Sequence, residues 1–105
     1  MNILSLSGLF GMPVRTMYSA SKFGLSGFGK AIRAEVSDFN IHVCNVYPDY
    51  VQTNISKNAL LGNGEKFNKV DDNAKKGYPV DKAVDEIFRA MTLKKNEFIL
   101  APLFF

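Results

Sequence analysis

Three short apolar runs alternate with two helix-length segments, and this alternation limits the fold more than any other feature of the chain. The runs lie at residues 2–5, 41–47 and 97–101, and glycine or proline follows each of them closely, as is typical of buried strands. Between them, residues 16–38 and the segment that begins at Pro79 carry apolar residues at steps of three and four, as on one face of a helix. The order strand, helix, strand, helix, strand predicts an α/β fold. It would be part of a doubly wound parallel sheet, with about three strands, two main helices and right-handed crossovers.

Each expected helix carries one row of apolar residues. In the first helix the row consists of Leu25, Phe28, Ile32, Val36 and Phe39. In the second helix it consists of Val80, Ala83, Val84, Ile87, Phe88 and Met91, and Pro79 suits the first helical position. Gly24, Gly27 and Gly29 lie inside the first helix, each at a cost of up to about 1 kcal/mol relative to alanine. The glycines either reflect low helix propensity alone or leave room for close packing of the helix.

Length and composition indicate one small domain and exclude several classes of protein. The chain has 105 residues, of which 47% are hydrophobic and 22% charged, as in an ordinary globular domain. Its net charge of +3 comes with scattered lysines and no aromatic and arginine platform, so we expect no nucleic acid partner. The eight uncharged residues 98–105 are too few for a membrane span, which takes about 20.

The single cysteine and the single histidine favour neither a disulfide nor a metal site. Cys44 lies in an apolar run, so we expect a buried, unreactive thiol. A chain without an internal disulfide suits a reducing compartment. His42 has no cysteine, histidine or carboxylate partners at the spacing of metal ligands, so we expect no metal.

A long polar segment, residues 54–77, separates the second expected strand from the second helix. Gly62-Asn-Gly64 within it is a turn signal. Because few apolar residues hold this segment down, we expect it to be the mobile part of the chain.

A tyrosine and a lysine four residues apart, Tyr18 and Lys22, are the first sign of chemistry, with Ser5 thirteen residues before the tyrosine. Residues four apart share one face of a helix, with Cβ atoms about 5–6 Å apart. A nearby ammonium favours the phenolate form of a phenol, which lets a tyrosine exchange a proton with an alcohol or carbonyl oxygen. A serine hydroxyl would give that oxygen a second hydrogen bond. Each residue alone also has a structural explanation: an aromatic at a helix start, a solvated lysine and a turn residue at a strand end.

The order and spacing of four motifs resemble the short-chain dehydrogenase/reductase family. The motifs are Ser5-Leu-Ser-Gly8, Tyr18-Ser-Ala-Ser-Lys22, Asn45-Val-Tyr-Pro48 and Thr53. The resemblance covers essentially the whole chain, which is similar to the carboxyl-terminal half of such an enzyme and its partial Rossmann-like sheet. Within the family, the chain is most similar to the branch called dehydrogenase/reductase SDR family member 7B. That likeness is carried by residues 50–54, Arg33-Ala-Glu35, Asn58-Ala59, Lys94-Lys95 and Ile99-Leu100-Ala101.

The resemblance implies a catalytic role for three of these residues. Tyr18 would act as general acid and base while a nicotinamide transfers hydride, and Ser5 would hold the substrate oxygen. Lys22 would favour the ionised form of the Tyr18 phenol. Tyr18 and Lys22 would both contact the cofactor, and Lys22 would form a hydrogen bond with the ribose of the cofactor. The implied substrate is a small alcohol or carbonyl compound, and residues 54–77 would cover it.

The resemblance also implies contacts with the cofactor and a partner. Pro48, Val51 and Thr53 would line the nicotinamide end of NAD or NADP, with the choice between the two left open. Asp49 stands where relatives have glycine, a residue that permits positive φ, so the cofactor geometry there is uncertain. A homodimer would form through the 16–38 helix. Proteins of the resembling branch are associated with the endoplasmic reticulum or peroxisomal membrane through an amino-terminal segment.

Several motifs of the family are missing from the sequence. No glycine-rich turn feeds a helix amino terminus, the arrangement that binds the pyrophosphate of the cofactor. We therefore expect residues 1–105 to be a single partial domain, the catalytic half without the nucleotide-binding half, and inactive alone. The alternative is a short, catalytically dead module that dimerises through the first helix.

Overall fold

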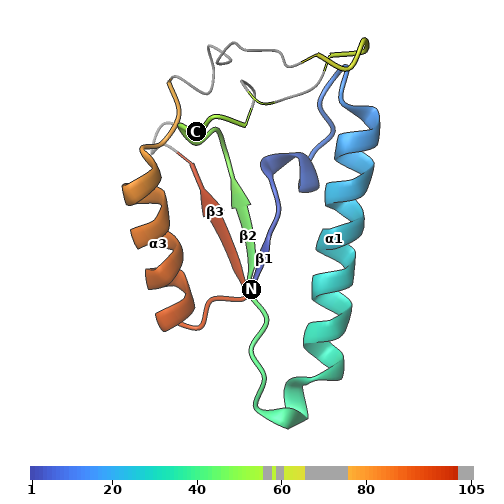
Figure 1. The fold of residues 1–105 in the computed structure, drawn as a ribbon. Coiled ribbons are helices and arrows are strands. Elements are labelled where there is room, and N and C mark those ends of the chain that lie inside the picture. The colour runs from blue at the N-terminus through green and yellow to red at the C-terminus, as the bar shows by residue number, and fades with distance from the viewer. Residues whose placement is uncertain (56–57, 59–60, 66–75, 102–105) are drawn as a thin grey trace.

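A parallel three-stranded sheet with a helix against it on each side makes up the described chain (Figure 1). The computed structural model describes residues 1–55, 58, 61–65 and 76–101. The strands are β1 (Asn2–Ile3), β2 (Asn45–Pro48) and β3 (Glu97–Leu100), in the order β1-β2-β3. The helices are α1 (Thr16–Glu35) and α3 (Val80–Thr92), with short 3-10 helices η1 (Leu6–Gly8) and η2 (Ser37–Phe39). The predicted α/β class, parallel strands and two main helices are confirmed.

The element boundaries differ from the expected ones by a few residues. The first strand ends at Ile3, and the second begins only at Asn45. α1 ends at Glu35, and the chain then makes the separate turn η2 before Asn40, whose φ of 54° stops the helical path. Asparagine tolerates this left-handed conformation better than most residues. Pro79 is the residue before α3 and not its first helical residue.

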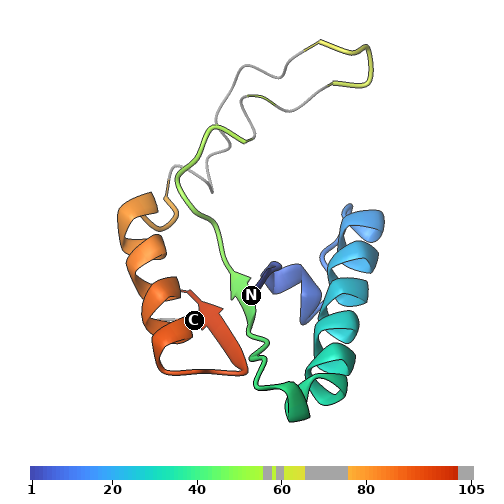
Figure 2. The same ribbon diagram turned by 60° about the horizontal axis from the view of Figure 1, so that its bottom comes forward.

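The two helices cover opposite faces of the sheet. Neighbouring residues of a strand point to opposite faces, so contacts of alternate residues assign each helix to a face. On one face, Ser26 of α1 forms hydrogen bonds with Asn45 and with Tyr47. On the other face, Phe98, which is paired with Val46, lines a hollow together with side chains of α3. Figures 1 and 2 show α1 and α3 on opposite sides of the strands.

This arrangement corrects the expected handedness of the connections. The chain steps across the sheet in one direction, from β1 to β2 to β3, through two helices on opposite faces. Two parallel crossovers that step in the same direction on opposite faces have opposite hands. The prediction of right-handed crossovers throughout is therefore wrong for one of the two, although about 98% of such connections are right-handed.

The packed face of α1 consists of small residues and not of the apolar row expected from the sequence. Ser19, Ser26 and Gly29 are the buried residues of α1. Phe28 is 58% exposed and Leu25 is 43% exposed. Phe39, just beyond the helix, is also exposed, while Ile32 and Val36 are half-buried. Small side chains let α1 lie close to the sheet, so the spacing of large apolar residues does not mark the inner face.

The face of α3 that meets the sheet also consists largely of small residues. Ala83 and Ala90 are buried, and Ile87 is half-buried. The rest of the apolar row, Val80, Val84, Phe88 and Met91, is exposed. None of the helices in residues 1–55 and 76–101 is both long and apolar enough to cross a membrane.

Part of the polar segment between β2 and α3 lies outside the described residues. The turn expected at Gly62-Asn-Gly64 is confirmed, because the Gly64 amide donates to the Leu61 carbonyl at 2.9 Å and Gly64 has a φ of 86°. The expectation that residues 54–77 are mobile and cover a substrate falls largely on residues 56–57, 59–60 and 66–75, outside the described part.

The glycines of α1 provide a matched test of the packing. A Cβ at Gly29 would collide with Asn45 Oδ1 and lie 2.6 Å from Asn2 Nδ2, whereas a Cβ at Gly24 would meet nothing within 4 Å. We predict that Gly29→Ala lowers the free energy of unfolding by about 1–3 kcal/mol through overpacking. Gly24→Ala should raise it by about 0.5–1 kcal/mol, because it removes backbone freedom from the unfolded chain.

Urea unfolding of the purified chain at low concentration, with circular dichroism as the signal, measures both changes. Equal effects of the two substitutions would contradict the assignment of Gly29 to the inner face and Gly24 to the outer face.

Candidate active site

The sequence-predicted site residues gather at the edge of the sheet where the parallel strands end. Ser5 follows β1, and residues 49–53 follow β2. α1 begins at the same edge, shown at the top of Figure 1, so its first turns bring Tyr18 and Lys22 there. The carboxyl ends of strands are where open α/β sheets bind ligands.

Tyr18 and Lys22 face each other on the first turns of α1. The Lys22 ammonium nitrogen lies 5.6 Å from the centre of the Tyr18 ring. Tyr18 is 43% exposed, and Lys22 is half-buried. The predicted pairing of the two side chains on one helix face is confirmed, and the phenol is open to a ligand.

The backbone around this pair is held by the segment between β1 and α1. Gly8 of η1 packs directly on α1, since a Cβ at this position would lie 3.1 Å from the Lys22 carbonyl oxygen. The Met12 amide donates to Ser19 Oγ at 3.4 Å, and Ser21 Oγ donates to the Tyr18 carbonyl at 2.7 Å. The chain after Ser5 is therefore fixed against the turn that carries Tyr18 and Lys22.

Ser5 lies next to this turn without a hydrogen bond to Tyr18 among the described contacts. Its hydroxyl oxygen accepts a hydrogen bond of 3.2 Å from the Ser7 amide, which caps η1. Ser5 is half-buried. The structure thus brings the segments of Ser5, Tyr18 and Lys22 together and gives Ser5 a local structural contact as well.

The residues after β2 extend along the same edge. Pro48 ends β2, Val51 pairs with Tyr78 in an isolated parallel bridge, and Thr53 is exposed. Thr53 Oγ1 accepts a hydrogen bond of 3.4 Å from the Ile55 amide. No direct contact between these residues and Tyr18 is among the described interactions.

Asp49 adopts an ordinary backbone conformation. Among the described residues other than glycine, a left-handed φ occurs at Val14, Asn40 and Lys94 and not at Asp49. The Asp49 amide donates to the Leu100 carbonyl at 2.8 Å, which continues the pairing of β2 with β3. Aspartate therefore occupies this position without backbone strain.

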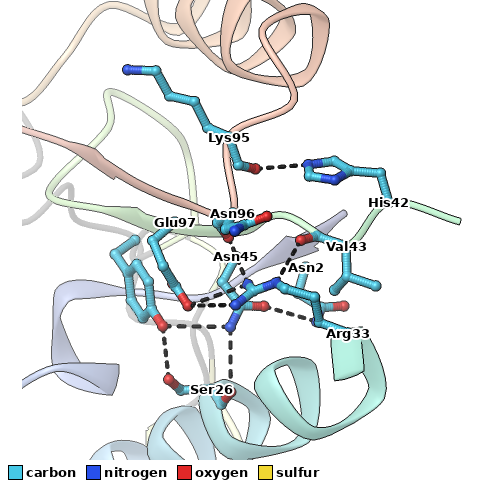
Figure 3. Close-up of polar contacts among 10 residues, drawn as sticks. Asn2, Ser26, Arg33, His42, Val43, Asn45, Lys95, Asn96 and Glu97 are labelled. Carbon is cyan, nitrogen blue, oxygen red and sulfur yellow. Dashed lines mark hydrogen bonds and ion pairs between the residues drawn. The ribbon is translucent and has the colours of Figure 1, made fainter. Parts of the chain in front are cut away.

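A buried polar cluster beneath the site joins α1 to β2, and sequence reasoning did not find it. Ser26 Oγ and the Tyr47 hydroxyl lie 2.7 Å apart, and Asn45 Nδ2 donates to the Ser26 carbonyl at 3.3 Å. Asn2 Nδ2 donates to Asn45 Oδ1 at 3.0 Å (Figure 3). Asn45 is fully buried, and every buried side-chain nitrogen and oxygen in the described residues has a partner. The one sequence signal was an asparagine inside an apolar run.

Arg33 holds the other end of α1 to the sheet. Its Nε donates to the Val43 carbonyl at 3.0 Å and its Nη2 donates to the Asn96 carbonyl at 2.6 Å. Its guanidinium also forms an ion pair with Glu97 at 3.2 Å (Figure 3). α1 is thereby attached to the segments that lead into β2 and β3.

Burial accounts for Cys44, and a hydrogen bond to the backbone accounts for His42. Cys44 is 2% exposed, as expected, and burial raises the pKa of its thiol. His42 Nε2 donates to the Lys95 carbonyl at 2.9 Å, so this nitrogen carries a proton (Figure 3). In the part of the chain that the structure describes, no group of three or more His, Cys, Asp or Glu side chains is arranged to hold a metal ion.

Comparison with known proteins adds an independent line of evidence. A family described as short chain dehydrogenase matches residues 1–63. The chain is 39% identical over 101 residues to a Drosophila melanogaster protein named "Dehydrogenase/reductase SDR family protein 7-like", covering 96% of this chain and 31% of that protein. It is 38% identical over 102 residues to the Danio rerio protein "Dehydrogenase/reductase SDR family member 7B", covering 96% of this chain and 33% of that protein. The Xenopus tropicalis member 7B is 35% identical, with the same shares covered.

The chain spans about a third of the length of these relatives. No solved structure matches it.

Proposed function

This chain belongs to the short-chain dehydrogenase family, and we propose that it is the carboxyl-terminal half of the catalytic domain of an oxidoreductase that interconverts alcohols and carbonyl compounds with NAD or NADP. The observation that carries the proposal is the Tyr18–Lys22 pair, with the ammonium 5.6 Å from an exposed phenol ring at the carboxyl edge of a parallel sheet. Relatives of this chain are named dehydrogenase/reductases. In this proposal residues 1–105 are one partial domain.

The cofactor would supply hydride transfer, and residues of this chain would move the proton. In the direction of oxidation, the Tyr18 oxygen would accept the proton of the substrate alcohol, while the bound cofactor would accept the hydride of the carbinol carbon; reduction would reverse both transfers. Lys22, whose ammonium lies 5.6 Å from the centre of the Tyr18 ring, would place a positive charge beside the phenol that exchanges the proton. Ser5 would donate a hydrogen bond to the substrate oxygen. It lies three residues before Gly8, which packs on the turn of α1 that carries Lys22.

The residues present fit the nicotinamide and ribose end of such a cofactor. Lys22 supplies an ammonium donor, and the exposed Thr53 hydroxyl follows Pro48 and Val51 at the same edge of the sheet. The sequence holds no glycine-rich turn for the pyrophosphate. We therefore expect the 105 residues alone to lack turnover. Activity is tested in a protein that joins this chain to the amino-terminal part of its relatives. This protein is called the completed protein.

Removal of the Tyr18 hydroxyl is the direct test of catalysis. We predict that Tyr18→Phe lowers kcat of the completed protein about 10²–10⁴-fold, because the ring remains and the transferable proton is lost. The assay follows nicotinamide absorbance with a panel of small alcohols and ketones. Cofactor binding, measured by fluorescence titration, should persist in the variant, which separates lost chemistry from lost binding. Unchanged turnover in Tyr18→Phe would refute the catalytic assignment.

We also propose that the outer face of α1 is a contact surface for a second copy of the chain. This face lies opposite the buried Ser19, Ser26 and Gly29 and is formed by exposed, uncharged residues. They are Met17, Ala20, Gly24, Gly27, Phe28 and Ala31. Side chains at Gly24 and Gly27 would meet nothing within 4 Å in one chain, which leaves room for close approach of another helix. A contact surface of this kind is what both the enzyme and the alternative, a catalytically dead dimerisation module, require.

A pair of phenylalanines on opposite faces of the molecule tests the dimer. Phe28 on α1 is 58% exposed, and Phe88 on α3 is 62% exposed, so neither substitution should unfold the protein. We predict that Phe28→Glu weakens self-association of the completed protein at least about tenfold, because a charge must be buried in the contact. Phe88→Glu should leave it unchanged. Sedimentation velocity over a range of concentrations measures both. An equal response of the two variants, or a wild type that remains monomeric, would contradict the proposal.

A further inference from the structure

Tyr78, just before α3, holds the chain that follows β2. The Tyr78 amide donates to the Tyr50 carbonyl at 2.8 Å, and the Gln52 amide donates to the Tyr78 carbonyl at 2.8 Å. These two bonds form the isolated parallel bridge between Val51 and Tyr78. Residues 50–52 are therefore fixed to Tyr78, which lies 27 residues after Val51 in the sequence.

The side chain of Tyr78 connects the same point to the end of β3. Its hydroxyl donates to the Ala101 carbonyl at 3.1 Å, and the Lys82 ammonium lies 5.1 Å from the centre of its ring. Tyr78 thus joins the residues after β2, the start of α3 and the residue after β3. A single side chain with a fixed ring and a bonded hydroxyl restricts all three.

Gly77 permits the close approach of the two segments. A Cβ at this position would collide with the Tyr50 carbonyl oxygen and lie 2.6 Å from the carbonyl carbon. Since backbone atoms cannot move aside as a flexible side chain does, a larger residue at position 77 would separate Tyr78 from Tyr50.

We propose that Tyr78 is a positioning residue for the cofactor contact of Thr53. Thr53 directly follows Gln52, whose amide is bound to the Tyr78 carbonyl, so the place of Thr53 at the sheet edge depends on this pairing. The inference rests on the proposed function, in which Thr53 contacts the nicotinamide end of NAD or NADP. Tyr78 acts through the backbone of Gln52 and touches neither substrate nor cofactor.

Tyr78→Phe removes the bond to Ala101 and keeps the ring and the backbone. Tyr50→Phe is the matched control, because it removes a hydroxyl from the paired segment that makes no hydrogen bond among the described residues. One hydrogen bond contributes about 0.5–1.5 kcal/mol, so the Gln52 amide should exchange with solvent roughly 2- to 12-fold faster in Tyr78→Phe, and at the wild-type rate in Tyr50→Phe.

The second measurement is steady-state kinetics of the completed protein. In Tyr78→Phe, KM for the nicotinamide cofactor should rise by about the same 2- to 12-fold, with kcat within twofold of the wild type. Gly77→Ala should raise the same KM by a different route, the collision with Tyr50. Both variants should retain the wild-type circular dichroism spectrum.

The outcomes separate this inference from the proposed function. Unchanged exchange at Gln52, or faster exchange with an unchanged cofactor KM, overturns the positioning role while Tyr18→Phe can still show the proposed chemistry. A wild-type completed protein without any nicotinamide-dependent turnover overturns the proposed function and the inference with it.

Discussion

The contact between Ser26 of α1 and Tyr47 of β2 determines where the helix that carries Tyr18 and Lys22 lies. Their hydroxyl oxygens are 2.7 Å apart in a buried site, and Asn45 donates to the Ser26 carbonyl from the same strand. A buried hydroxyl without a partner costs about 1–3 kcal/mol, so each member of this cluster restricts the others. Ser26 lies one turn after Lys22. The cluster therefore sets the distance of the helix from the sheet immediately behind the Tyr18–Lys22 pair.

The two faces of the sheet are packed by different means. On the α1 face, a polar cluster and small residues such as Gly29 bring helix and strand into close contact. On the α3 face, buried Ala83 and Ala90 approach a sheet of apolar residues such as Val46, which is fully buried. The polar face carries the candidate chemistry. Close packing by hydrogen-bonded groups holds a helix in one position, which a site for proton transfer requires.

Much of this arrangement could be predicted from the sequence, because its signals are local. The apolar runs marked all three strands, and the four-residue spacing of Tyr18 and Lys22 placed both side chains on one face of α1. The inner face of α1 could not be predicted from its apolar residues, since Phe28 lies outside and Ser26 inside. That choice depends on partners such as Asn45, which are distant in sequence. The hand of each crossover and the pairing of Tyr78 with the chain after β2 are likewise tertiary, and no local pattern encodes them.

The central claim, that the Ser26–Tyr47 contact fixes α1 to the sheet, is tested most directly by a double-mutant cycle. Urea unfolding of the wild type, Ser26→Ala, Tyr47→Phe and the double variant gives the coupling free energy between the two hydroxyls. Each single substitution removes the bond between the two hydroxyls and leaves one of them behind, with only a 3.5 Å bond from Asn45 Nδ2 remaining at Tyr47, whereas the double substitution removes both. We therefore expect the double variant to lose less stability than the sum of the two single losses, with a coupling of about 0.5–3 kcal/mol. Strictly additive losses would show that the two hydroxyls do not depend on each other and would contradict the account.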